Sequence, residues 1–173
     1  MARWATVAVA ATVGLLGVGM GGRASADDGW HRVRIEGTIE SDNPTVGPLA
    51  CDLANHCVVN LSSVNVWGGG LAGSTASRSA VALDQSTGLA SIEGFELFTG
   101  QVAGCGDGSF TMTGAITRLL QSPGVGTLVI VAGSGSGALA GITGRGTFSV
   151  TPTGPTSAAS TFTIAARCRR ATS

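Results

Sequence analysis

No lysine and no tyrosine occur in the 173-residue chain, and charged residues make up only 12% of it. The basic side chains are therefore all arginines, and beyond residue 26 eight of them stand against ten carboxylates, a net charge near −2. Nucleic-acid-binding domains carry a basic excess, which is absent here. The one basic cluster, Arg167, Arg169 and Arg170, is interpreted as a solvated C-terminal end. The composition thus argues against nucleic acid as a partner.

Long apolar runs are also missing beyond residue 26, so no membrane span is expected there. The apolar run that does occur, at 5–20, follows Arg3 and is succeeded by Ala-Ser-Ala at 24–26. A basic start, a short apolar core and a small-x-small end are typical of a secretory signal peptide. Residues 1–26 are thus predicted to be a signal peptide cleaved near Ala26, leaving 27–173 as a single secreted domain. An uncleaved membrane anchor is the alternative.

Motifs of common enzyme classes are missing as well. No G-x-S-x-G elbow occurs, and neither His31 nor His56 lies near a nucleophile, so hydrolase chemistry is not expected. A glycine-rich stretch at 131–148 follows an apolar run and fits G-x-G-x-x-A at 133–138. A dinucleotide site, however, needs a helix there and an acidic residue about 20 positions later. Further glycines interrupt any helix and no acidic residue follows Asp107, so we expect turns and close backbone approach, and no cofactor.

Four cysteines are present, all beyond the predicted leader: Cys51, Cys57, Cys105 and Cys168. An even number of cysteines in an exported protein predicts disulfides. A metal site is the alternative, because His56 adjoins Cys57. Five residues separate the first two cysteines, however, where zinc sites usually have two to four, and no second cysteine pair of that kind follows. We therefore expect disulfides and no metal. Arginine without lysine and abundant glycine and alanine are typical of high-GC bacteria, so a secreted actinobacterial protein is expected.

The remaining sequence alternates with period two. Segments such as "SFTMTGAI" (109–116) and "STFTIAA" (160–166) place apolar residues on one face and small polar residues on the other. Half-buried antiparallel strands have this pattern, and Gly-, Pro- and Asp-rich turns separate the segments, including "DNP" at 42–44. About eight strands are predicted, near 30–40, 57–67, 72–84, 89–101, 108–118, 125–132, 144–151 and 159–168. The chain is therefore expected to be all-β, an antiparallel up-and-down barrel of about eight strands.

Such a barrel also predicts how the cysteines pair. Successive turns of an up-and-down barrel alternate between its two ends. Cys51 and Cys57 belong to the first turn, whereas Cys105 lies in the fourth turn and Cys168 ends the eighth strand, both at the opposite end. A disulfide requires Cα atoms within about 7 Å, which excludes pairing between the two ends. The predicted bonds are Cys51–Cys57 and Cys105–Cys168.

Two segments carry a resemblance to a known family. "FELFTGQVAGCGDGSF" (95–110) contains Glu96-x-Phe98-x-Gly100 and Gly108-x-Phe110, and "GSGSGALAGITGRGTF" (133–148) supplies a long glycine-rich connection. These residues resemble a bacterial family of allene oxide cyclase-like barrels. The resemblance implies a calycin-like barrel fold for a largely uncharacterised family. Related barrels guide cyclisation or coupling of a reactive hydrophobic intermediate, so an enzymatic role as a cyclase or isomerase is implied by resemblance only.

The candidate site residues are Glu96, Phe98, Phe110 and Phe148, as the lining of a barrel cavity. Glu96 shares strand parity with Ile92 and Phe98, so it would point inward with them and could act as a general acid or base. In the alternative, Phe95 and Leu97 face inward, and Glu96 is solvated or pairs with an arginine. Arg145 would then be a rim residue or the ion-pair partner of Glu96.

Three classes of function remain open. The first is a secreted barrel that binds a small hydrophobic molecule or has a structural role, and the second is a cyclase or isomerase that uses the same cavity. The third is a different fold, an Ig-like sandwich of the kind found in secreted antibiotic-carrier proteins, which have a similar composition. The sequence carries no signal for a particular oligomeric state.

Overall fold

The computed structural model describes residues 29–153 and 158–170, and all regular structure within them is β. The strands are Trp30–Val46 (β1), Ala50–Cys51 (β2), His56–Gly69 (β3), Leu71–Asp84 (β4), Leu89–Val102 (β5), Gly106–Leu119 (β6), Gly124–Ile130 (β7), Ser136–Gly137 (β8), Thr143–Pro152 (β9) and Ala158–Arg169 (β10). The predicted leader, residues 1–26, lies outside the described residues.

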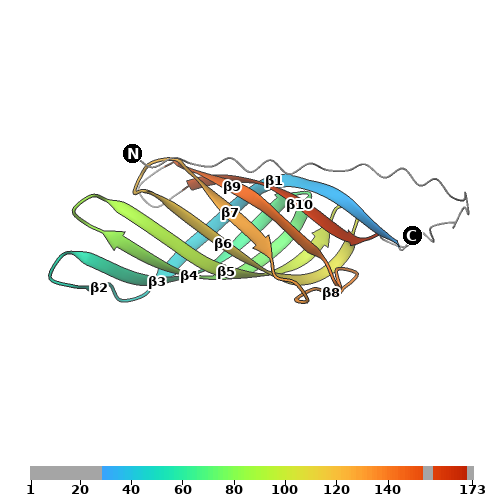
Figure 1. The fold of residues 1–173 in the computed structure, drawn as a ribbon, viewed down its shortest axis with the longest axis horizontal. Helices are drawn as coiled ribbons and strands as arrows, with labels where there is room; N and C mark the ends of the chain where they lie inside the picture. Colours follow the sequence, from blue (N-terminus) through green and yellow to red (C-terminus); the bar gives the residue numbers. More distant parts are fainter. Residues whose placement is uncertain (1–28, 154–157, 171–173) are drawn as a thin grey trace, which may run out of the picture.

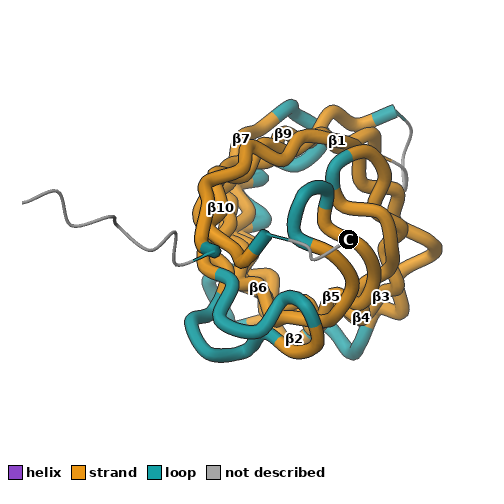
Figure 2. Tube along the Cα trace, turned by 90° about the vertical axis from the view of Figure 1, so that its right-hand side faces the viewer, coloured by secondary structure: helices purple, strands orange, loops and turns teal. Residues whose placement is uncertain are grey.

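Eight of these strands close into an antiparallel barrel (Figure 1). Sequential neighbours pair from β3 to β7, β9 follows β7, and β10 follows β9. β1 closes the ring because it pairs with β10 along one edge and with β3 along the other. Figure 2 looks along the barrel and shows the strands as a ring. The predicted up-and-down barrel is confirmed. The Ig-like sandwich, which consists of two separate sheets with open edges, is excluded because β1 pairs with both β10 and β3 and closes one continuous sheet.

One end of the barrel is filled by side chains and covered by the glycine-rich segment. Between β7 and β9 the chain folds over this end, where Leu139 and Ile142 are fully buried. Gly133, Gly137 and Gly141 there have positive φ, as the close turns of this segment require. The buried side chains of this closed half include Ile35, Trp67, Leu71, Phe98, Val102, Phe110 and Ile164. The segment thus caps a hydrophobic core, and no helix follows its glycines within the described residues.

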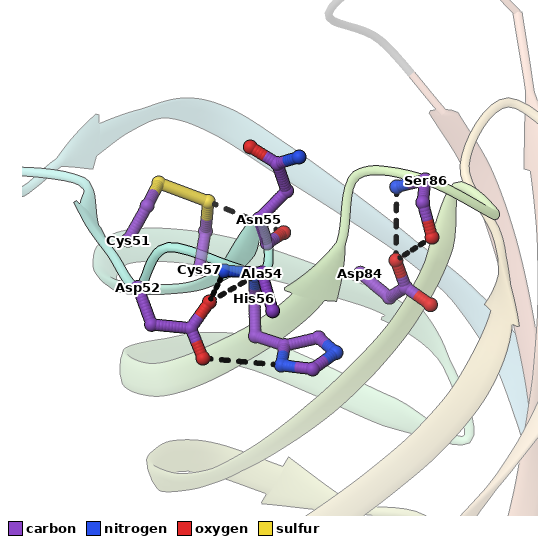
Figure 3. The surroundings of a disulfide bond; sticks show 8 residues. All are labelled: Cys51, Asp52, Ala54, Asn55, His56, Cys57, Asp84 and Ser86. Atoms are coloured by element: carbon purple, nitrogen blue, oxygen red, sulfur yellow. Dashed lines mark hydrogen bonds and ion pairs between the residues drawn. A yellow bond between two sulfur atoms is a disulfide. The ribbon is translucent and has the colours of Figure 1, made fainter.

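Two disulfides join the elements as predicted. Cys51–Cys57 closes the loop between β2 and β3, and Cys105–Cys168 links the β5–β6 turn to the end of β10. Figure 3 shows the first bond beside the turn in which Asp52 accepts hydrogen bonds from the backbone N–H groups of Ala54 and His56. The second bond is fully buried at the closed end. Two disulfides indicate that the protein folds in an oxidising environment.

The predicted turn at 42–44 is wrong, because β1 continues through it to Val46. The pairing of β1 with β3 shifts register between Asp42 and Thr45. This irregularity accommodates Pro44, which has no backbone N–H to donate to the ladder. The turn follows instead at Gly47, whose N–H donates to the carbonyl of Asn60 at 2.8 Å.

Candidate functional site

A cavity of about 390 Å³ occupies the half of the barrel away from the glycine-rich cap. Ile39, Asn65, Ser77, Ile92, Glu96, Ile116, Leu128 and Phe148 line its inner part. The cavity extends to Gln121, in the turn after β6, and to Pro152 and Ala158 at the ends of β9 and β10. Because Gln121 is exposed, the cavity reaches the surface at this end. We call this the open end.

The wall of the cavity is polar on one side and apolar on the other. Inward positions of β3 and β4 carry Ser63, Asn65, Ser77 and Ser79, with Ser41 and Ser160 on the neighbouring β1 and β10. Inward positions of β5, β6, β7 and β9 carry Ile92, Ile116, Leu128, Phe148 and Val150, and the charged side chains at these inward positions are Glu96 on β5 and Arg118 on β6. A molecule in the cavity would therefore meet hydroxyl and amide groups on one side, and on the other mainly hydrocarbon with one carboxylate and one guanidinium group.

Glu96 is the carboxylate on this wall. β5 places Ile92, Glu96 and Phe98 inward, while Phe95 and Leu97 are about half exposed on the outer face, at 51% and 49%. The alternative parity, with Phe95 and Leu97 inward, is therefore wrong. Arg145 lies exposed on the outer face of β9 and does not pair with Glu96.

Two donors hold one oxygen of Glu96. Oε2 accepts a hydrogen bond from Thr75 Oγ1 at 2.6 Å and another from Asn65 Nδ2 at 3.1 Å. Both donors are themselves positioned. Trp67 Nε1 donates to Thr75 Oγ1 at 3.2 Å, and Ser63 Oγ donates to Asn65 Oδ1 at 3.1 Å.

The directions of these bonds follow from the donors available. An indole N–H can only donate, so the Thr75 hydroxyl accepts from Trp67 and has its own proton to give to Glu96. Trp67 is buried and packs on Phe162, with ring centroids 4.8 Å apart, which fixes the start of this chain of bonds. Glu96 Oε1 has no hydrogen bond to the residues that the structure describes. One carboxylate oxygen is therefore locked and the other is available to a bound molecule.

Arg118 is the basic residue of the cavity lining and lies toward the open end on β6. Its Nη1 donates to the carbonyl of Ser122 at 2.7 Å, which holds the side chain against the β6–β7 turn. Its Nε is buried without a partner in the described part of the chain. The cavity thus has an acceptor, Glu96 Oε1, at its inner part and the Arg118 side chain nearer its mouth.

The four predicted site residues fall in two places. Glu96 and Phe148 line the cavity. Phe98 and Phe110 are fully buried beyond it, where their rings pack with centroids 4.9 Å apart, so they support the cavity and do not line it.

Sequence reasoning missed Asn65, Thr75, Ser77 and Arg118. Along β3 the two faces are similar in sequence, since Ser63 and Asn65 point inward between the outward Ser62, Val64 and Val66. A rule that places apolar side chains inward and polar side chains outward cannot decide which face of such a strand points into the barrel. Trp67 would have been the useful signal. It is a large apolar residue that is expected to point inward, and Asn65 and Ser63 lie on the same face of the strand because they are two and four residues before it.

The acidic side chains with lowered pKa lie outside the cavity. Hydrogen bonds from Ser86 and Thr87 lower the pKa of Asp84 to about 2 in the β4–β5 turn. The backbone N–H of His56 lowers the pKa of Asp52. Within residues 29–153 and 158–170, no three His, Cys, Asp or Glu side chains are grouped as a metal site would require. None of the described segments forms a helix of the length and apolarity needed to span a bilayer.

Comparison with known proteins gives a family and a fold. Residues 48–162 match the family described as "Protein of unknown function (DUF3224)". The crystal structure of a DUF3224 protein of unknown function from Shewanella oneidensis is similar, with a TM-score of 0.58 and 17% sequence identity over 82% of this chain and 100% of that chain. No curated protein matches the sequence. The family match spans more than half of the chain, and the chain therefore belongs to the DUF3224 family of β-barrel proteins of unknown function.

Proposed function

We propose that this protein is a secreted barrel that binds a small amphipathic molecule in the cavity, with an apolar body and one hydrogen-bond-donating group directed at Glu96. The observation that carries the proposal is the unequal state of the two Glu96 oxygens: Oε2 accepts two bonds and Oε1 accepts none from the described residues. A hydroxyl or an ammonium group supplies the donor that Oε1 lacks. The disulfides and the N-terminal sequence support secretion.

The size and lining of the cavity support this class of ligand. Small-molecule sites typically enclose about 300–1,000 Å³, with mostly apolar walls and a few placed polar groups. At about 390 Å³ the cavity is near the lower limit and suits a short-chain or single-ring molecule. The apolar side from Ile92 to Val150 would contact its hydrocarbon part.

Three eight-carbon probes that differ only in their head group test the proposal. The wild-type protein should bind octylamine most tightly, then octanol, and octanoate least, because a carboxylate head would face the Glu96 carboxylate. Affinity is measured by isothermal titration calorimetry. Hydrogen bonds to charged groups contribute about 1.5–3 kcal/mol, so the preference for amine over acid should be about tenfold or more.

The Glu96→Gln variant should lose this preference, because a neutral amide can donate to octanoate as well as accept from octylamine. Glu93→Gln is the matched control: Glu93 lies on the same strand but is exposed on the outer face. The proposal fails if the wild-type protein shows no order among the three probes, or if both variants change it equally.

A second candidate function is that of a cyclase or isomerase, which the resemblance to allene oxide cyclase-like barrels suggests. The observation in its favour is again the available Glu96 oxygen, which could remove a proton from a bound molecule. Cyclohexanone in D₂O tests this, since a base in the cavity would speed exchange of its α-protons, followed by NMR. Exchange that depends on Glu96 supports catalysis, whereas exchange equal to that with Glu96→Gln leaves binding alone.

A further inference from the structure

Large apolar side chains are exposed at the open end of the barrel, on and beside three turns. The turns join β2 to β3 (52–55), β4 to β5 (85–88) and β6 to β7 (120–123), and Figure 1 shows them at the left, away from β8. We call the following five residues the apolar rim: Leu53, Leu89, Leu119, Leu120 and Val125. Leu53 is fully exposed, and the other four are between 44% and 69% exposed. The rim lies beside the mouth of the cavity, which reaches Gln121.

Backbone hydrogen bonds join the three turns into one continuous surface. The N–H of Gln85 donates to the carbonyl of Asn55 at 3.1 Å, which links the first two turns. Figure 3 shows these two turns side by side. The N–H of Leu120 donates to the carbonyl of Gly88 at 2.8 Å, which links the second turn to the third. Because neighbouring strands lie about 4.8 Å apart, the rim spans roughly 19 Å from β3 to β7.

The closed end has no comparable rim among the described residues. Its β3–β4 turn contains Gly70 and its β5–β6 turn consists of 103–105, Ala-Gly-Cys. In the capping segment 131–142 the large side chains of Leu139 and Ile142 are buried, and Val131 alone is a large apolar residue that is exposed. Turn formation as such therefore does not account for the leucines at the open end. Exposed apolar residues that are grouped in this way indicate an interaction site.

The turns that carry the rim are held by their own polar groups. The Cys51–Cys57 disulfide closes the first turn, in which Asp52 accepts hydrogen bonds from two backbone N–H groups. In the second turn Asp84 accepts hydrogen bonds from two hydroxyl groups, and in the third a backbone carbonyl accepts one from Arg118. Polar groups that are bonded within the protein cost less to remove from water than unbonded ones. The rim can therefore approach an apolar medium without leaving these groups unsatisfied.

We infer that the open end docks on a bilayer of zwitterionic phospholipid, with the apolar rim inserted between the headgroups and the acyl chains. Separate turn tips suit a fluid lipid layer, whereas a protein interface needs a closely packed face. Residues 52–55, 85–88 and 120–123 also contain none of the aromatic, methionine and arginine residues that are enriched in protein interfaces. Because the cavity opens beside the rim, an amphipathic ligand would pass directly between bilayer and cavity; this last step rests on the proposed function.

The charges beside the rim favour a headgroup that ends in a cation. Hydrogen bonds lower the pKa of Asp84 to about 2, so it is ionised at neutral pH, and its partners are uncharged hydroxyl and N–H groups. The three turns contain no arginine. A choline or ethanolamine group complements this carboxylate, whereas the net negative charge of phosphatidylglycerol does not. Binding should therefore not require anionic lipid, and it should change little with salt because the inserted side chains are uncharged.

A tryptophan placed in the rim tests the insertion directly. The emission of Leu53→Trp should shift to shorter wavelength with phosphatidylcholine vesicles and be quenched by brominated acyl chains, because the ring enters hydrocarbon. Leu97→Trp is the matched control, since Leu97 is about half exposed on the outer face of β5, roughly 26 Å along the strand from Leu89. Its emission should not change. The protein is used without residues 1–26, so that the predicted leader cannot insert; every strand and both disulfides lie beyond them.

Serine variants test the contribution to affinity, measured by vesicle sedimentation. Leu53→Ser should reduce partitioning into phosphatidylcholine vesicles about tenfold, the effect of removing one buried leucine, and Leu97→Ser should leave it unchanged. Equal loss in both variants overturns the inference, as does an unshifted emission of Leu53→Trp or binding that requires phosphatidylglycerol. A wild-type dimer that Leu53→Ser converts to a monomer overturns it too, because the rim would then be a protein interface.

The docking can fail or succeed separately from the proposed function. Glu96→Gln should partition into vesicles as the wild-type protein does, because Glu96 lies inside the barrel and not on the rim. A loss of partitioning in this variant would place the lipid in the cavity and overturn docking through the rim. If Leu53→Trp inserts while the eight-carbon probes show no order of affinity, the docking stands and the proposed function fails.

Discussion

Inward-facing glycines bring neighbouring strands of this barrel into close contact, and Gly146 is the sharpest example. A Cβ atom at Gly146 would lie 2.0 Å from the carbonyl oxygen of Thr163 on β10, so the sheet could not keep its pairing around a side chain. Gly114, also inward, has more space, since its nearest neighbour would be Leu128 Cδ2 at 3.4 Å. The same residue type is thus obligatory at one position and replaceable at another.

We therefore predict that Gly146→Ala destabilises the protein by about 3 kcal/mol, the upper part of the usual range for overpacking. Gly114→Ala should change stability by less than about 1 kcal/mol, because an alanine that fits also restricts the unfolded chain. Urea unfolding followed by tryptophan fluorescence measures both. Equal midpoints for the two variants would contradict this account.

Asp84 should make stability depend on pH. Its carboxylate accepts hydrogen bonds from Ser86 Oγ at 2.6 Å and Thr87 Oγ1 at 2.8 Å, which lower its pKa from 3.8 to about 2. A pKa that is lower in the folded state adds stability above the unfolded value, and this is lost as pH falls through the folded value. Asp84→Ala should therefore have a lower Tm than wild type at pH 7, and the gap should close between about pH 4 and pH 2. If the Tm difference between the two proteins persists at pH 2, the lower stability comes from the alanine substitution and not from the ionisation of Asp84.

At the scale of strands, the sequence predicted the eight barrel strands but neither of the short ones. Alternation is visible only over several residues, and β2 and β8 have two residues each. β1 runs past its predicted end because a register shift absorbs Pro44 within the strand. Turn-forming residues indicate where a chain can bend, but pairing with β3 decides whether it does.

The candidate site was less predictable from the sequence than the strands were, because it depends on how neighbouring strands are aligned with one another. Glu96 could be placed on the inner face because Ile92 and Phe98 share its parity. Asn65 and Thr75, which hold its carboxylate, lie 31 and 21 residues before it in the sequence, on β3 and β4. Which residues of β3 and β4 oppose Glu96 depends on the register of three strands, and no local pattern encodes it.

The two disulfides join very different lengths of chain and should differ in their contribution to stability. Cys105–Cys168 closes a loop with a sequence separation of 63, and Cys51–Cys57 one of 6. The loop-entropy relation gives about 4 kcal/mol for the first and about 2 kcal/mol for the second. We predict that Cys105→Ala with Cys168→Ala lowers the free energy of unfolding about twice as much as Cys51→Ala with Cys57→Ala. Urea unfolding of the two double variants checks the order, and the reverse order would contradict it.

The interior of the barrel is filled with side chains at one end and contains the cavity at the other. Large side chains and the segment carrying Leu139 and Ile142 fill the closed end, whereas serines and glycines on the inward positions leave space at the other.

Gly114 allows the cavity to be filled without disturbing the barrel. It faces the cavity opposite Gly94, and a Cβ there meets Leu128, Thr127 and Phe148 only at 3.4–3.8 Å. Gly114→Val would place two methyl groups toward this space on a strand that favours β-branched residues. We predict that octylamine affinity falls about tenfold or more while the Tm stays near that of the control Thr113→Val, an exposed outward neighbour on β6. Calorimetric titration and thermal unfolding measure the two effects. If Gly114→Val binds octylamine as well as Thr113→Val does, the probe does not occupy this cavity and its contact with Glu96 is excluded.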